Sequence, residues 1–534
     1  MLRSKLSAAS IDVLRLLRLF VVLGGFAIPA IAGVLLGHPP SAQQLGQRMR
    51  HAFERMGLTY VKLGQFLAMR FDLFPEAFCA ELAQLFDDVA PMPAEQARRV
   101  LEQALGAAPE TIFERFDTEP MAAASVAQVH RARTRAGEDI AIKLQRYGIA
   151  RIFAADMRNL VRLAHVIDRL GVIGAQSAVE AVCEFERFTA QELDFHKEGE
   201  TAERLRARAG PHEYAPRILW EYTSERVLAM ELIRGHRLSD VIAGRAVGLS
   251  EDELDSAARN LARACLRQLF ETGFFHADPH PGNIFIVDNG TICFIDFGIF
   301  GELPRSRREA LAGYIEDVAT GSFASAYRRF QTILTPSPAT DYRGLRQDIG
   351  RIFRSWHAAL SDSSAPTQER YLGKYVGDFM EAVRRNHVGM SIDTLLFWRT
   401  LITLDATAMQ FRQSFDLLAV IREFFQEMRP NPLLAGLAAA TRPAAVLDAL
   451  DWCAGLPDAA GALLADPATP ALIDEADARD RRQANRDTVL LVLAALGLAS
   501  VMLFATGAGL VSTAPLLLAG LGLLLARPRV RWAR

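Results

Sequence analysis

Two short motifs, at residues 276–283 and 296–298, constrain the fold of this chain more than any other feature. Asp278 precedes Asn283 by five residues, and Asn283 precedes Asp296 by thirteen. This is the spacing of the catalytic and metal-binding loops in kinase-type phosphoryl transfer. That reaction needs a carboxylate beside the attacking hydroxyl or water, and oxygen ligands for Mg2+ on the ATP phosphates. We therefore expect Asp278 to fill the first role and Asn283 and Asp296 to bind the metal.

The rest of the chain decides whether those motifs form a site, because an Asp-Phe-Gly sequence alone is also typical of a tight turn after a strand. At 534 residues the chain exceeds what one hydrophobic core usually holds, which predicts two or three packed units. Its 60 basic and 62 acidic side chains give a net charge of -2, so we expect no nucleic-acid partner. The five cysteines include no Cys-x-x-Cys pair, which predicts reduced thiols facing a cytosol.

Residues 1–40 form a basic and apolar N-terminal segment. Basic residues up to Arg18 precede residues 19–37, which carry no charge. A cleaved signal peptide has this signature, but export would separate an ATP site from its ATP. A membrane span would place the basic residues on the far side, against the positive-inside rule. We therefore favour an interfacial or re-entrant helix over a span.

Residues 41–110 are predicted to form a helical extension that carries the sequence Lys62-Leu63-Gly64-Gln65. On a helix, Lys62 and Gln65 lie three residues apart and share a face. Gly64 leaves room for another backbone to approach closely. The alternative interpretation is a solvated helix with an incidental glycine.

Residues 111–235 are predicted to form the smaller, strand-containing lobe. Lys143, in Ile-Ala-Ile-Lys, matches the strand lysine that holds the ATP α- and β-phosphates, although it would also suit an edge strand in solvent. Where a kinase has a glycine-rich loop, this chain has alanines followed by serine. Alanine disfavours positive φ angles, so this loop should cover the phosphates in a stiffer geometry. The loop residues are Ala122, Ala123, Ala124 and Ser125.

A charged helix and a strand complete this lobe. Kinases pair the strand lysine with a glutamate on a helix, for which Glu198 is the first candidate and Glu192 the second. A charged helix that is merely solvated is the alternative interpretation. The strand at residues 227–233 leads into the hinge between lobes, where backbone groups of Glu231 and Ile233 would face adenine.

The remaining chain is predicted to comprise a helical C-lobe at residues 236–430, an Ala/Pro-rich helical linker at 431–487 and a transmembrane hairpin at 488–526. The last segment has thirty-nine uncharged residues, long enough for two spans with a tight turn. Arginines flank it on both sides, so both ends should be cytoplasmic. A buried soluble hairpin is the alternative.

Taken in this order, the Lys-x-Gly-Gln, alanine-loop, Glu-x-Asp, catalytic-loop and Asp-Phe-Gly motifs resemble those of the UbiB family of atypical kinase-like proteins, over residues 48–404. Glu-x-Asp here is Glu192-Leu193-Asp194. The resemblance implies that Lys62, Gly64 and Gln65 are regulatory, with Lys62 and Gln65 meeting Glu192 and Asp194 over the substrate groove. It also implies that the alanine loop favours ATP hydrolysis over protein phosphorylation.

We therefore expect an α+β, mainly α, bilobal protein-kinase-like fold with an N-terminal helical extension and a C-terminal transmembrane hairpin. The resemblance implies a membrane-associated ATPase with ATP and Mg2+ as cofactors. It would support ubiquinone (coenzyme Q) biosynthesis at the bacterial inner membrane, its catalytic domain facing the cytoplasm. Membrane lipids, hydrophobic quinone precursors and other quinone-biosynthesis proteins are the expected partners. The alternatives are a true kinase acting on a protein or isoprenoid small molecule, and a nucleotide-switched, non-catalytic scaffold.

Overall fold

The computed structural model describes most of the first 428 residues. The linker, the predicted hairpin at 488–526 and Ser125 lie outside the described part. No helix within that part is long and apolar enough to cross a bilayer. The described residues are 12–19, 21–22, 24–26, 36–70, 73–85, 91–124, 126–169, 177–246, 248–336, 339–361, 372–412 and 415–428.

The N-lobe contains an antiparallel sheet with the strand order β1-β3-β4-β6, and β2 pairs with β3. Side chains alternate across β4, so that Ile142 and Leu144 are buried in the lobe core while Lys143 lies on the opposite face. The strands are β1 (Phe113–Phe116), β2 (Ala122–Ala123), β3 (Ala127–Thr134), β4 (Asp139–Gln145) and β6 (Val227–Glu231).

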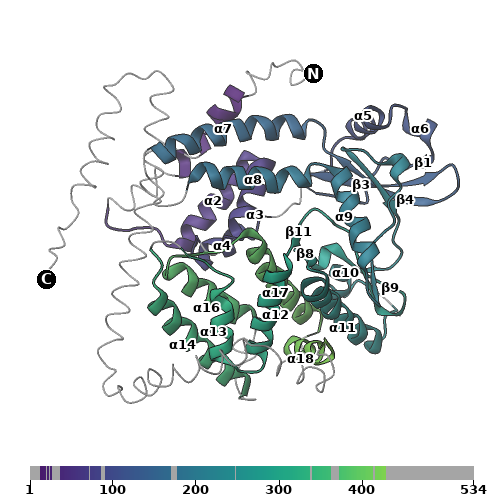
Figure 1. Cartoon of the computed structure of the whole chain (residues 1–534). Coiled ribbons are helices and arrows are strands. Elements are labelled where there is room, and N and C mark those ends of the chain that lie inside the picture. The colour runs from purple at the N-terminus through teal and green to yellow at the C-terminus, as the bar shows by residue number, and fades with distance from the viewer. Residues whose placement is uncertain are drawn as a thin grey trace, which may run out of the picture.

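Helices surround this sheet and build the extension. Figure 1 shows α7 and α8 lying alongside each other, next to the extension helices α2, α3 and α4. Ser41 and Gln44 form a capping box that starts α2. The helices are α2 (Ala42–Met56), α3 (Leu58–Ala68), α4 (Glu76–Leu82), α5 (Ala94–Leu105), α6 (Pro109–Ile112), α7 (Ile149–Arg169), α8 (Ala178–Glu192) and α9 (Phe195–Arg208).

The C-lobe is mainly helical and carries a small sheet of order β5-β10-β9-β7, a β8–β11 pair and a short β12–β13 pair. Its strands are β5 (Glu213–Tyr214), β7 (His236–Arg237), β8 (Phe274–His276), β9 (Ile284–Val287), β10 (Thr291–Phe294), β11 (Phe300–Glu302), β12 (Thr335–Pro336) and β13 (Val388–Gly389). Its helices are α10 (Leu238–Ile242), α11 (Glu251–Arg267), α12 (Arg305–Ala319), α13 (Phe323–Gln331), α14 (Tyr342–Ser361), α16 (Leu372–Arg385), α17 (Ile392–Phe411) and α18 (Leu417–Met428). Single turns occupy Trp220–Tyr222, Gln268–Thr272, Pro281–Asn283 and Asp288–Gly290.

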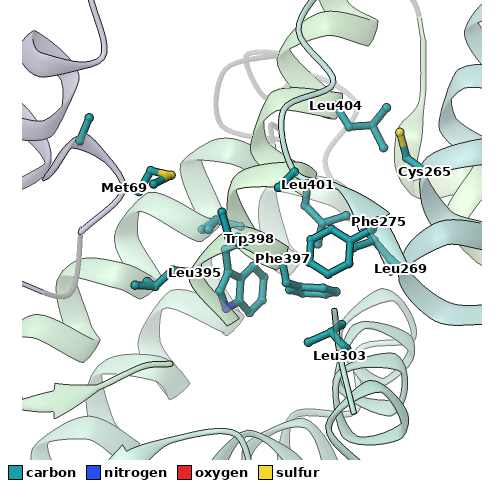
Figure 2. Close-up of a cluster of buried hydrophobic side chains, with 14 of the residues drawn as sticks. Met69, Cys265, Leu269, Phe275, Leu303, Leu395, Phe397, Trp398, Leu401 and Leu404 are labelled. Atoms are coloured by element: carbon teal, nitrogen blue, oxygen red, sulfur yellow. The ribbon is translucent and has the colours of Figure 1, made fainter. Parts of the chain in front are cut away.

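Helix α17 forms the centre of the C-lobe core. It is apolar on nearly all sides, as expected of a helix that is buried all round. Figure 2 shows Trp398, Phe397 and Leu401 of α17 in one cluster with Phe275 of β8 and Leu269. The strand that leads into the catalytic loop therefore rests directly on this helix. Leu395 and Trp398 of this helix are buried.

Residues 12–19, 21–22 and 24–26 of the N-terminal segment are helical, and this helix packs against the protein. Arg15 Nε lies 2.7 Å from Asp156 Oδ1 of α7, and the Asp156 side chain is fully buried. Leu19 and Val22 are buried in the main core. Part of the apolar run is therefore used for intramolecular packing, which its sequence alone did not indicate.

Gly64 of α3 allows close packing, but side chains rather than another backbone approach it. A Cβ atom there would lie 2.1 Å from Leu85 Cδ1 and 2.8 Å from Phe53 Cδ2. No side chain fits without displacing these neighbours. The expected tight approach is present, and its partners differ from those expected.

Asp405 of α17 makes folding stability depend on pH. It accepts hydrogen bonds from the N–H groups of Leu372 and Gly373, and burial raises its pKa to about 6 despite them. A raised pKa in the folded state means that this contribution to stability is complete below pH ~4 and is lost as pH rises to about 6. In urea titrations, Asp405→Asn should remove this fall in unfolding free energy between those pH values. An unchanged pH profile would contradict the assignment.

Candidate active site

Lys143, Glu198 and Asp296 form an ion-pair network at the junction of the lobes, in which Glu198 is buried and Asp296 is partly exposed. Lys143 Nζ lies 2.6 Å from Glu198 Oε1 and 3.0 Å from Asp296 Oδ1. The register of β4 directs Lys143 toward α9, where Glu198 lies one turn after the Asp194 cap. Of the two glutamates considered from sequence, the structure brings Glu198 to Lys143.

The three charges in this network shift one another's pKa values. Burial, and then the neighbouring Asp296, raise the pKa of Glu198 to about 7, against the attraction of Lys143. For Asp296, burial favours the neutral acid, but the ammonium of Lys143 outweighs it and holds the pKa below its ordinary value. Burial also opposes the charge on Lys143, yet the two carboxylates raise its pKa. Asp296 is therefore held ionised, as a metal ligand must be.

Asn283 and Asp296 fit a Mg2+ site completed by nucleotide and water. The side-chain amide of Asn283 donates to Asp278 O at 3.4 Å, and the backbone N–H of Asn283 donates to His280 O. The backbone of Ile295, next to Asp296, donates to Asn283 O, which ties the two motifs together. Among the described residues, no group of three or more His, Cys, Asp or Glu is arranged to hold a metal ion. One carboxylate and one amide suit Mg2+, which takes its other ligands from phosphates and water.

The catalytic loop is held in shape by His276. Its buried ring accepts a hydrogen bond at Nδ1 from the backbone N–H of Asp278, 3.0 Å away, and the backbone N–H of His276 donates to Gln268 Oε1 at 2.8 Å. Burial lowers the pKa of His276, so the ring is neutral and Nδ1 can accept. These bonds fix the direction in which the loop presents Asp278.

Helix α17 supports the same loop through three side chains that sequence reasoning missed. Arg399 Nη2 lies 3.2 Å from Asp278 Oδ2. Thr400 and Thr407 donate to the carbonyls of His276 and Pro279, at 3.4 and 3.1 Å. The sequence does contain one clue to such a contact. Kinase loops have arginine immediately before the catalytic aspartate, whereas this chain has alanine there. Only the fold shows that Arg399 brings a guanidinium there.

Replacing Arg399 should slow turnover more than it weakens nucleotide binding. Arg399→Ala removes the cation that orients Asp278. Because the Asp278 carboxylate would then be misplaced, we expect kcat to fall roughly 10–100-fold, with ATP affinity little changed. Arg412→Ala is a matched control, because Arg412 ends the same helix and pairs with Asp255 away from the loop. Steady-state phosphate release and nucleotide titration measure the two effects. Equal losses in both variants would contradict a local role for Arg399.

Hydrogen bonds to Ala124 hold the alanine loop against β3 and Arg146. Ala122 and Ala123 form β2, Ala124 N–H donates to Ala127 O at 2.7 Å, and Arg146 Nε donates to Ala124 O at 2.8 Å. This arrangement is a tight hairpin with a side-chain restraint. The stiffness expected from alanine in place of glycine stays a prediction.

The hinge residue Glu231 is more constrained than expected. It ends β6, and its backbone N–H already donates to Arg217 O at 2.9 Å. Its carboxylate accepts from Tyr214 Oη at 2.6 Å. An adenine contact from the backbone N–H of Glu231 would therefore have to displace its bond to Arg217. Ile233 lies in the following loop, before β7.

The helical extension reaches the site through Lys62. Lys62 Nζ lies 2.8 Å from Glu192 Oε2, and both side chains are almost fully buried. A Cβ atom on Gly298 would be 3.6 Å from Glu192 Cγ, so this ion pair lies against the Asp-Phe-Gly motif. Gln65 donates to Leu85 O at 3.1 Å. Asp194, expected to face Lys62 and Gln65, instead caps α9 by accepting from His196 N–H.

Two further contacts join the extension to the site. Arg70 pairs with Glu184 of α8 at 3.1 Å. Met69 Sδ contacts Arg399 Nη1, the same guanidinium that pairs with Asp278. The extension thus touches both the Asp-Phe-Gly side and the catalytic-loop side of the site.

Comparison with known proteins places these features in a family context. A model of the ABC1 atypical kinase-like domain matches residues 84–328. A probable protein kinase UbiB of Marinobacter nauticus is 31% identical over 479 residues, covering 85% of this chain and 84% of that protein. A second probable protein kinase UbiB, of Sodalis glossinidius, is 31% identical over 392 residues, or 72% of this chain and 70% of that protein.

Other relatives are longer. Chloroplastic ACTIVITY OF BC1 COMPLEX KINASE 3 of Arabidopsis thaliana is 30% identical over 79% of this chain, which spans 59% of that protein. An uncharacterized Synechocystis protein is 31% identical over 70% of this chain and 63% of its own length. The chain therefore spans about 60% of the length of these two relatives.

Proposed function

The chain belongs to the UbiB family of atypical kinase-like proteins, and on that premise we propose that it is a membrane-associated, Mg2+-dependent ATPase that supports ubiquinone biosynthesis. The family is implicated in that pathway, and its domain is kinase-like. The observation that carries the proposal of hydrolysis is the Lys62–Glu192 ion pair against Gly298. A helix bound there restricts access by a protein acceptor while water still enters.

The proposed roles follow from the contacts. Lys143 binds the ATP phosphates, and Glu198 orients Lys143. Asp278 positions the attacking water, with Arg399 holding its carboxylate. Asn283 and Asp296 hold Mg2+, which neutralises charge on the phosphates when it is bound.

Nucleotide would lie beneath the alanine loop, against the backbone of the hinge. Ala122, Ala123, Ala124 and Ser125 cover the phosphates, and Glu231 and Ile233 face adenine in this proposal. The Arg146 restraint on Ala124 supports a loop that changes shape little between nucleotide states.

The membrane part of the proposal is supported by the sequence. Residues 488–526 carry no charge and have arginines on both sides, which favours a hairpin in the bacterial inner membrane with the catalytic domain in the cytoplasm. A site tethered there lies beside hydrophobic quinone precursors and the enzymes that process them. ATP turnover would then help extract or pass on such lipids.

Two other functions use the same residues. A true kinase, acting on a protein or an isoprenoid small molecule, would share every catalytic group and differ only in the acceptor. A non-catalytic scaffold switched by nucleotide would need the binding residues but not the Arg399–Asp278 pair, so that pair favours catalysis.

Quinone-intermediate profiling tests the pathway assignment. Cells lacking the protein should accumulate an early prenylated precursor, and the wild-type gene should reverse this while Lys62→Ala does not. Unchanged quinone pools in the deletion strain would count against a role in ubiquinone biosynthesis.

A further inference from the structure

The N-terminal helix exposes apolar side chains on one face. Ten large hydrophobic residues are exposed in the described part of the chain, and four of them lie on this one helix. Their spacing places them on one side of a helix. Exposed apolar residues gathered in this way mark an interaction surface more often than a random scatter does. They are Val13, Leu14, Leu17 and Val21, at 56%, 59%, 49% and 73% exposure.

Asp12 and Arg15 of this helix point the other way, into the protein. Asp12 accepts two hydrogen bonds from Arg158 at 2.6 and 2.8 Å, and Arg15 pairs with buried Asp156. Arg18 donates to the carbonyl of Arg55. The polar face thus anchors the helix to α7 and α2, and the apolar face is held outward.

Helix α7 adds positive charge beside this apolar face. Its exposed arginines fall on one side of the helix, at intervals of four or seven residues. Arg158 pairs with Asp12 of the N-terminal helix. The acids of α7 do not neutralise the other three, because Asp156 is buried with Arg15 and Asp168 accepts from Ser177 and Ala178. These three are Arg151, Arg162 and Arg169.

We propose that this surface, formed by the outward face of residues 12–26 and the arginine side of α7, docks on an anionic phospholipid bilayer. Apolar side chains beside basic ones are the pattern of helices that lie in the membrane interface. The charge also selects the occupant: two copies meeting through this surface would bring like charges together, whereas an anionic leaflet complements them.

This inference rests on the membrane association in the proposed function, and it is independent of ATP hydrolysis. A hairpin at 488–526 would tether the chain to the bilayer, and the surface would set how the catalytic domain lies on it. Docking through α7 would hold the domain at a fixed orientation rather than on a free tether.

Spin labels on the full chain in vesicles test the docking. Leu17→Cys and Val21→Cys each place a label on the apolar face, and Tyr342→Cys is a matched exposed control in the C-lobe. Cys183 and Cys453 are replaced by serine, and a background sample with no added cysteine is measured beside them. Cys79, Cys265 and Cys293 are buried and should not label.

In vesicles of phosphatidylcholine and phosphatidylglycerol, we expect labels at residues 17 and 21 to be accessible to oxygen and shielded from a water-soluble nickel complex. The label at residue 342 should remain accessible to nickel. Removing the phosphatidylglycerol, or replacing Arg151, Arg162 and Arg169 by glutamine, should reduce the shielding, because each arginine near an anionic surface is worth roughly fivefold in binding.

Equal nickel access at all three positions would overturn the docking surface. Shielding that persists without phosphatidylglycerol and comes with spin–spin coupling between copies would identify a protein interface instead, which also overturns it. Phosphate release is followed in the same vesicles. Failed docking with retained vesicle association and hydrolysis would leave the proposed function standing, whereas absence of the chain from the vesicles would contradict its membrane part.

Discussion

Asp296→Asn should abolish Mg2+-dependent ATP turnover while leaving the protein folded. Asp296 is the carboxylate that lies 3.0 Å from Lys143, and Lys143 holds its pKa low enough for it to remain ionised. The amide keeps the size of the side chain and removes the charge that draws a divalent cation. Loss of one preorganised electrostatic contact of this kind costs roughly 10²–10³-fold in kcat, and loss of a metal ligand should reach at least the upper end.

The stability of this variant should fall only slightly. Lys143 holds the pKa of Asp296 low, so the charge on Asp296 stabilises the folded state and the amide loses that contribution. The substitution also removes the repulsion between Asp296 and Glu198, and Glu198 keeps its ion pair with Lys143. We expect a slightly lower melting temperature.

Phosphate release and thermal melting measure the two effects. Asp288→Asn, at an exposed turn in the same lobe, is the matched control and should behave as wild type in both. Full turnover by Asp296→Asn would exclude the catalytic role and favour the nucleotide-switched scaffold.

Lys62→Ala should release the extension from the catalytic domain. The Lys62–Glu192 pair is short, at 2.8 Å, and its side chains are only 11% and 7% exposed. Removing one partner of a buried pair costs about 3 kcal/mol or more, because the remaining charge has lost its counterion. The loss should appear in urea unfolding and as faster hydrogen exchange in α3.

A second substitution separates charge from packing. Lys62→Ala combined with Glu192→Gln removes the buried carboxylate as well, so we expect it to recover part of the lost stability. Lys374→Ala is the control, because Lys374 pairs with Asp378 at a similar distance, but both side chains are about half exposed and the pair is worth less than about 1 kcal/mol. Equal losses of stability in the two lysine variants would contradict the claim that the Lys62–Glu192 pair holds the extension on the catalytic domain.

The catalytic residues could be predicted from sequence because their chemistry is concentrated in short motifs. The spacing of Asp278, Asn283 and Asp296 is set by one loop and one hairpin, so it can be recognised in the sequence without knowledge of the fold. Lys143 and Glu198 come from a strand and a helix whose pairing is typical of kinase-like lobes. The structure brings them within hydrogen-bonding distance.

The supporting contacts could not be predicted in the same way. Arg399 and Thr407 lie on a helix more than one hundred residues after the loop that they hold, and an apolar helix pattern says only that α17 is buried. Asp194 was expected in a contact between elements, but its position before α9 lets it satisfy that helix's own N–H groups.

The N-terminal helix shows a different limit. Hydropathy shows that residues 19–37 lack charge, but it does not show that Asp12 and Arg15, which precede them, turn inward to α7. The orientation of Asp12 and Arg15 depends on partners almost 150 residues away. Only the folded arrangement separates a packed face from an exposed one.

Hydrolysis rather than transfer is tested most directly by the fate of the γ-phosphate. The full-length protein in vesicles is given ATP labelled on that phosphate, together with membrane extract, and the Asp296→Asn variant serves as background. We predict free labelled phosphate and no labelled protein or lipid above that background. A labelled acceptor whose formation requires Asp278 would contradict hydrolysis and identify the protein as a kinase.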